Sequence, residues 1–133
     1  MKLRTILLVC GSSLLLLISG CSRKNPLAGR TWEFVYCDND YTALTFSDDS
    51  FSVVDTKHGR HEGVMITNGS YLIEGNSLIL KGDSAQLTVD NVNYSNTASI
   101  TGYDGTYTWN IIHNSILQLE KNKDTFVEFK LVR

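Results

Sequence analysis

The chain is poor in proline and cysteine, and neither sign of charge is in excess. Its single Pro and ten Gly show no Gly-X-Y period, which excludes a collagen-like fibre. Three Cys are too few for a small scaffold held together by disulfides. A formal net charge of -2 lacks the basic excess of a nucleic-acid-binding domain. With 42% hydrophobic and 20% charged residues in 133, the composition is that of one globular domain rather than a disordered chain.

No stretch of the sequence reaches the roughly 20 apolar residues that a transmembrane helix needs. The longest apolar segment, Ile6–Ile18, has 13 residues and is interrupted by Gly11–Ser13. Lys2 and Arg4 precede it. A basic start followed by a short apolar segment is typical of a secretory signal peptide, which is removed from the mature protein. We therefore exclude residues 1–20 from the expected fold.

The end of this segment resembles the lipobox of bacterial lipoproteins. Ile18 is followed by two small residues, Ser19 and Gly20, and then by Cys21. The resemblance implies cleavage before Cys21, diacylglycerol on its thiol, and acylation of the new amino terminus, with palmitate as a typical chain. Two or more acyl chains give a stable membrane anchor. Because Ser22 stands where an Asp retains some lipoproteins in the inner membrane, we expect a cell-envelope protein anchored in the outer membrane.

The mature chain is acidic and carries one further thiol. Cleavage removes two basic residues and no acidic one, which leaves 10 basic and 14 acidic residues among 113. Residues 21–26 are the lipidated Cys and a short tether, and residues 27–133 are the folded domain. Cys37 has no intramolecular partner, so we expect a buried or half-buried small hydrophobic residue, with an intermolecular disulfide as the alternative.

Residues 27–133 alternate apolar and polar side chains with a period of two. The alternation is clearest at 32–36, 86–90 and 107–111, and no window has the 3.6-residue apolar period of a helix. Turn residues recur about every 8–12 residues, which indicates about 8–10 short antiparallel strands. A meander of this length exposes two edges unless it closes. We therefore predict an all-β domain that forms a single antiparallel up-and-down β-barrel after a cleaved lipoprotein signal peptide.

Turns and connections are predicted from glycine, asparagine and charged residues. Glu74–Asn76, Lys81–Asp83 and His113–Asn114 are expected to be tight turns. Residues 57–63 (KHGRHEG) are expected to form a polar loop with two Gly, and residues 91–96 an Asn-rich connection.

Several segments together resemble the lipocalin-like, calycin-type domains of small bacterial lipoproteins. The segments that carry the resemblance include a Gly shortly before a Trp at the opening, a second strand, a central hairpin and a last hairpin; they are Leu27–Trp32, Leu44–Ser47, Gly69–Leu78, Asn114–Leu119 and Phe126–Leu131. The resemblance implies an up-and-down barrel of eight to ten strands, with Trp32 at its closed end. It implies no particular ligand.

The candidate interior of the barrel is aromatic. Five residues share the apolar faces of the expected strands: Trp32, Phe34, Tyr71, Tyr107 and Trp109. A barrel of this size has room for side chains or for one small ligand. These residues are therefore either a filled core or the lining of a pocket.

The sequence offers little catalytic or metal-binding chemistry. Two residues separate His58 from His61, with Asp55 and Glu62 nearby, and this spacing can bring both imidazoles to one metal. A loop does not preorganise such ligands, and no third ligand is fixed by spacing, so we assign no metal and no cofactor. No Gly-x-Ser-x-Gly motif and no phosphate-binding Gly-rich loop is present. We expect a protein that is not an enzyme and does not bind nucleic acid.

Two modes of binding remain open for a lipid-anchored protein of this kind. In the first, the barrel is filled, and the segments 57–63 and 91–96 bind an envelope protein or a glycan. In the second, the barrel carries a small apolar or amphipathic ligand inside it. The small size of the domain favours the first.

Overall fold

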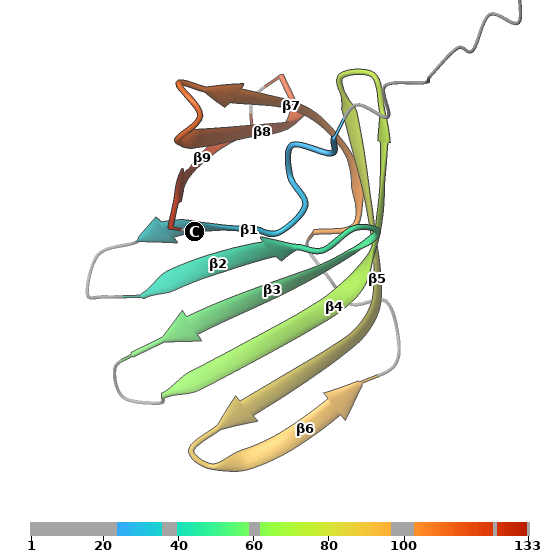
Figure 1. The fold of residues 1–133 in the computed structure, drawn as a ribbon. Coiled ribbons are helices and arrows are strands. Elements are labelled where there is room, and N and C mark those ends of the chain that lie inside the picture. Colours follow the sequence, from blue (N-terminus) through green and yellow to red (C-terminus); the bar gives the residue numbers. More distant parts are fainter. Residues whose placement is uncertain (1–23, 36–39, 59–61, 97–102, 124, 133) are drawn as a thin grey trace, which may run out of the picture.

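The computed structural model describes residues 24–35, 40–58, 62–96, 103–123 and 125–132 (Figure 1). Within these ranges the chain is all-β, and no helix that could cross a membrane is present. The strands are β1 (Arg30–Val35), β2 (Tyr41–Phe46), β3 (Ser50–Lys57), β4 (Gly63–Glu74), β5 (Ser77–Val89), β6 (Val92–Asn96), β7 (Gly105–Ile112), β8 (Ile116–Asn122) and β9 (Thr125–Leu131).

Eight of these strands close into an antiparallel up-and-down barrel, which confirms the predicted fold class. Each of β1 to β5 pairs with the next, β5 pairs with β7, and β7 to β9 continue the meander. The barrel closes where β1 meets β9, with Trp32 opposite Leu131 and Glu33 opposite Lys130. The N–H of Val132 also donates to the carbonyl of Thr31 at 2.9 Å.

The remaining strand, β6, lies outside the closed barrel because β5 pairs with two different strands along its length. Residues 77–80 of β5 pair with β7, whereas residues 85–89 pair with β6. The sheet from β1 to β6 therefore continues past the closed barrel, and β6 forms its outer edge (Figure 1).

The β4–β5 hairpin bends where its register shifts, between Asn68 and Gly69. Gly69 lies so close to its neighbours that a Cβ atom there would stand 2.1 Å from the carbonyl oxygen of Lys81 and 2.7 Å from the ring of Phe51. Only a residue without a side chain fits such an approach. The bulge therefore lets residues 69–82, at the tip of the hairpin, join the closed barrel. The rest of the hairpin, on the other side of the bulge, diverges from the barrel.

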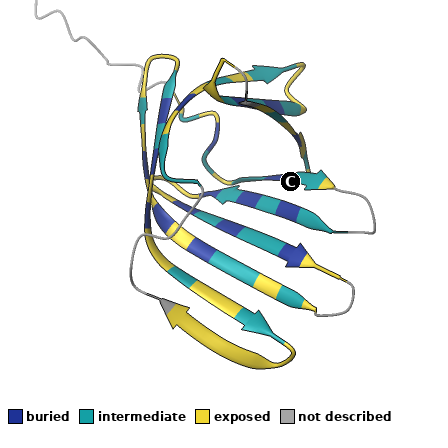
Figure 2. Cartoon of the chain, turned by 180° about the vertical axis from the view of Figure 1, so that it is seen from behind, coloured by how far each residue is buried: buried dark blue, intermediate teal, exposed yellow. Residues whose placement is uncertain are grey.

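Apolar residues on the inner faces of the strands fill the closed part of the barrel. Buried and exposed residues alternate along most strands, whereas residues 92–95 of β6 are all exposed (Figure 2). Leu27, which precedes β1, is also completely buried. The buried hydrophobic residues are Leu27, Trp32, Leu44, Phe46, Phe51, Val53, Tyr71, Leu78, Leu80, Tyr107, Leu117, Leu119 and Phe129.

Two of the predicted turns are confirmed and two predictions are wrong. Gly75 has φ 61°, and His113 and Asn114 have φ 51° and 57°, as tight hairpin turns require. Residues 81–83, predicted to turn, lie inside β5, because the bulge accommodates the Gly there. Residues 91–96, predicted to be a connection, contain strand β6, and the turn before it is formed by residues 90–91.

Several predicted features lie outside the described residues. They are the signal peptide, the lipidation site Cys21, the thiol of Cys37 and the second histidine of the loop, His61.

Candidate functional site

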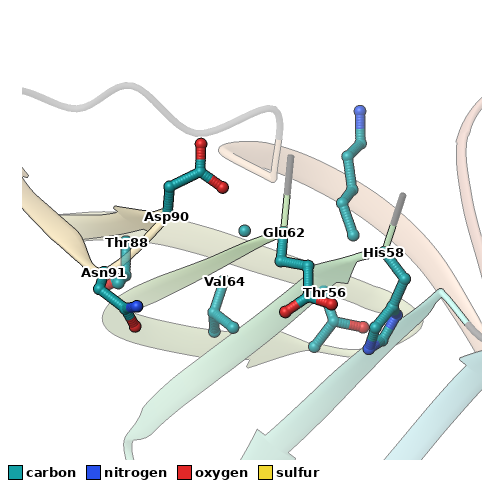
Figure 3. A pocket seen from close by; sticks show the side chains of 9 residues that line it. Thr56, His58, Glu62, Val64, Thr88, Asp90 and Asn91 are labelled. Carbon is teal, nitrogen blue, oxygen red and sulfur yellow. The ribbon is translucent and has the colours of Figure 1, made fainter. Parts of the chain in front are cut away.

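At the end of the sheet beyond the closed barrel, the connection between β3 and β4 lies next to the turn between β5 and β6, although the two segments are far apart in the sequence. The end of β3, the start of β4 and the β5–β6 turn meet there, and the N–H of Asp90 donates to the carbonyl of Glu62 at 3.1 Å. Their side chains surround a surface pocket of about 540 Å³ (Figure 3). Its lining consists of Thr56, Lys57, His58, Glu62, Gly63, Val64, Thr88, Asp90 and Asn91.

This surface pocket is predominantly polar. Thr56 and Thr88 line it, but their hydroxyls are engaged within the protein. The buried Thr56 hydroxyl bonds to the main chain of Tyr41, and the Thr88 hydroxyl donates to Asn93 Oδ1. Its lining also includes Glu62, Asp90, Lys57 and Asn91, and the side chains of Glu62 and Asp90 point in opposite directions (Figure 3). Such a set of donors and acceptors, open to water, suits recognition of a hydroxyl-rich or amide-rich ligand through hydrogen bonds.

The structure separates Asp55 from His58, which the sequence had grouped. His58 lies at the end of the loop, where its backbone N–H donates to Asp40 Oδ1 at 2.6 Å and its ring Nδ1 lies 3.3 Å from the same oxygen. Asp55 faces the barrel interior, where its Oδ1 accepts hydrogen bonds from the hydroxyls of Thr42 and Tyr103. No group of three His, Cys, Asp or Glu side chains that could hold a metal occurs in the described part of the chain.

The five predicted interior aromatic residues lie on the inner side of the barrel. Trp32, Tyr71 and Tyr107 are buried, and Phe34 and Trp109 are partly buried and pack against the core. The ring of Tyr71 meets that of Phe46 edge-on, with centroids 5.0 Å apart. Trp32, Tyr71 and Tyr107 thus belong to the core, whereas Phe34 also lines a surface pocket of about 460 Å³.

The two buried tyrosine hydroxyls are held by hydrogen bonds. Tyr107 donates to the carbonyl of Tyr103 at 2.7 Å, and burial, reinforced by the charge of Asp104, raises the pKa of Tyr107 to about 12. Tyr71 donates to the carbonyl of Ser47 at 2.6 Å, and burial raises its pKa as well. Both groups are therefore neutral hydrogen-bonding members of the core at physiological pH.

A second, mainly apolar groove lies on the inner face of the sheet beyond the closed barrel. Its volume is about 360 Å³, and its lining is Asp55, Lys57, Gly63, Met65, Leu87 and Val89. Near it, the hydroxyl of Thr67 is completely buried and has no hydrogen-bond partner among the described residues. The sequence did not identify this groove, because alternation assigns residues to the inner face without showing where the barrel stops enclosing that face.

Comparison of the chain with protein-family models, with curated proteins and with solved structures finds no match.

Proposed function

We propose that this protein is a lipid-anchored lipoprotein of the bacterial cell envelope whose lipocalin-like barrel is a non-catalytic binding domain. The anchor is Cys21, and the binding site is the polar pocket at the end of β3, the start of β4 and the β5–β6 turn. Its partner is an envelope glycan or the polar surface of an envelope protein.

The position of the tether supports this arrangement. The side chain of Asn25 bonds to the hydroxyl of Tyr71 and the carbonyl of Asp48, and Leu27 is buried. The chain is thus fixed to the barrel from Asn25 onward. A chain of four residues spans at most about 14 Å, which limits the distance between Asn25 and the anchor. The polar pocket begins at the other end of β3, which runs about 23 Å from Ser50 to Lys57. The pocket therefore lies at the end of the barrel away from the anchor.

The observation that carries the proposal is the meeting of two polar segments in one pocket beside a filled barrel. Among the described residues, thirteen buried hydrophobic ones pack inside the barrel, which favours a ligand site on its surface. The residues that line the surface pocket carry carboxylate, amide and ammonium groups, which match the hydroxyl groups of a sugar better than an apolar ligand. The binding site is thus expected on the surface rather than inside.

Binding to immobilised envelope glycans and to extracted envelope proteins tests this proposal. The test variant combines Asp90→Asn with Asn91→Gly, since both new residues tolerate the positive φ of the turn. Asn114→Gly changes the equivalent turn of the β7–β8 hairpin and is the matched control. We expect affinity to fall about tenfold or more in the double variant and to stay unchanged in the control. Equal binding by the double variant and the control, or no binding by the unaltered chain, contradicts the proposal.

The inner groove favours a second candidate function, carriage of a small amphipathic ligand. Met65, Leu87 and Val89 offer an apolar surface, and Asp55 lies in the same groove as a hydrogen-bond acceptor for the polar end of a ligand. Native mass spectrometry of the gently purified chain tests it. A reproducible added mass that denaturation releases, and that Leu87→Glu abolishes, supports the carrier, whereas a bare chain excludes it.

A further inference from the structure

Strand β6 has a hydrogen-bonded neighbour on one side, β5, and stands at the end of the strand order in the described sheet (Figure 1). A strand in this position presents main-chain N–H and C=O groups to which another strand can pair. Proteins usually protect such edges with Lys, Pro, an inward charge or a bulge. The sequence of β6, VNYSN, has no charged residue and no Pro, and its pairing with β5 is regular.

The turn before β6 determines which main-chain groups face outward. Asp90 and Asn91, with φ 48° and 66°, form a two-residue turn that Val89 and Val92 flank. A two-residue hairpin is closed by a hydrogen-bonded pair, and bonded and non-bonded pairs then alternate along the hairpin. The N–H and C=O groups of Asn93 and Ser95 therefore point away from β5, toward the open edge.

The side chains beside this edge are apolar on one face. Tyr94 pairs with Leu87, and Val92 with Val89, so that all four lie on the inner face of the sheet with Met65. Val92 is 51% exposed and Tyr94 57% exposed, although both are large hydrophobic residues. An apolar strip next to a strand edge that pairs with no described strand is typical of a surface that another strand covers.

We propose that β6 is a self-association surface, on which β6 of a second copy of this chain pairs antiparallel about Tyr94. In this register, Asn93 of one copy exchanges reciprocal N–H···O bonds with Ser95 of the other. Tyr94 then faces Tyr94 of the second copy as a non-hydrogen-bonded pair, in which side chains approach most closely. The two apolar strips join into one surface across the two-fold axis, as an isologous contact requires.

A second copy suits this edge because the segment is complementary to itself. The outward-facing donors and acceptors match in number and position under the two-fold axis, and the central pair is aromatic. Ala85–Val89 of β5 and the whole of β6 lack charged side chains, so antiparallel pairing brings no like charges together. The surface is separate from the polar pocket in its chemistry and does not depend on the lipid anchor.

Sedimentation equilibrium of the chain from Ser22 to Arg133 tests the proposal. This part contains the whole closed barrel and its core. We expect its average mass to rise from monomer toward dimer over about 1 to 100 µM. Ser95→Pro removes the outward N–H while leaving the bonds to β5, and Ser95→Ala keeps that N–H as the matched control. We expect the dimer to dissociate at least about tenfold more readily in Ser95→Pro than in Ser95→Ala.

A second variant keeps the test decisive if Ser95→Pro unfolds. Tyr94→Lys places two like charges at the centre of the dimer, and Phe126→Lys, at another exposed hydrophobic residue, is its control. A monomeric unaltered chain, or unchanged dimerisation of both Ser95→Pro and Tyr94→Lys, overturns the proposal. Glycan or protein binding by the monomeric variants is measured separately, so failure of the dimer and failure of the proposed function are distinguishable.

Discussion

Gly69 is the residue on which the course of the β4–β5 hairpin depends. It faces Gly82 across the register shift, and its surroundings leave no room for a Cβ atom. The absence of a Cβ atom at this residue thus permits the bulge at which the closed barrel and the open sheet separate.

Replacing this glycine is expected to destabilise the protein. Gly69→Ala forces a Cβ against the Lys81 carbonyl and the Phe51 ring, and overpacking of this kind costs about 3 kcal/mol. Gly63→Ala is the control, because its nearest neighbours would stand at 3.5 and 3.6 Å. Urea unfolding of both variants measures the difference. A Gly69→Ala variant as stable as Gly63→Ala would show that the backbone can relax there without loss.

Tyr107 is expected to give the protein an alkaline limit of stability. Its pKa in the folded protein is about 12, above the value near 10 of an unfolded tyrosine. The stability that this group contributes is therefore complete below pH about 10 and is lost as the pH rises through about 12. Ultraviolet titration of tyrosinate and unfolding at several pH values measure it. The unfolding free energy of Tyr107→Phe should fall less steeply with pH in this range. An identical fall in the variant and the unaltered protein would assign the effect to other groups.

At the scale of the element, the segment before β1 belongs to the core although it is not a strand. The N–H of Leu27 donates to Asn25 Oδ1 at 3.0 Å, the N–H of Gly29 donates to the carbonyl of Phe46 at 2.8 Å, and Leu27 itself is completely buried. This segment therefore fastens the tether to the barrel as well as closing the core.

Truncation of the Leu27 side chain should reveal that role. Leu27→Ala leaves a cavity in a completely buried site and is expected to lose about 3 kcal/mol of unfolding free energy. Val35→Ala, at a residue that is 65% exposed, should change stability by no more than about 0.5 kcal/mol. Chemical denaturation of the two variants measures the difference in unfolding free energy. Equal stabilities would contradict a stabilising role of Leu27 in the core.

The strand β6 shows how an element can be missed in a sequence that otherwise alternates clearly. Its Asn and Ser residues are frequent in loops, so residues 91–96 were predicted as a connection. What makes them a strand is the neighbour: Ala85–Val89 offers a free edge, because β7 pairs only with the first residues of β5. Propensity within the segment carries no information about that edge.

On the scale of the whole molecule, we expect the lipid on Cys21 to hold the barrel at the membrane. Cys21→Ala should abolish incorporation of a radiolabelled or clickable palmitate analogue and release the protein from washed membranes, because the thioether needs the thiol. Cys37→Ala is the control and should remain membrane-bound. Cell fractionation with immunoblotting provides the measurement, and a membrane-bound Cys21→Ala variant would contradict lipid anchoring there.

The sequence by itself determined the all-β class, the barrel and the interior aromatic residues. These depend on a period of two and on local turn chemistry at residues such as Gly75 and Asn114, which neighbouring residues along the chain suffice to define. Only the tertiary structure decided that β5 divides between β6 and β7, that Asp90 meets Glu62, and that Asp55 bonds to Tyr103 rather than lying with His58. The reason is physical: alternation assigns a face to each residue, whereas the choice of neighbouring strand is made by contacts between distant parts of the chain.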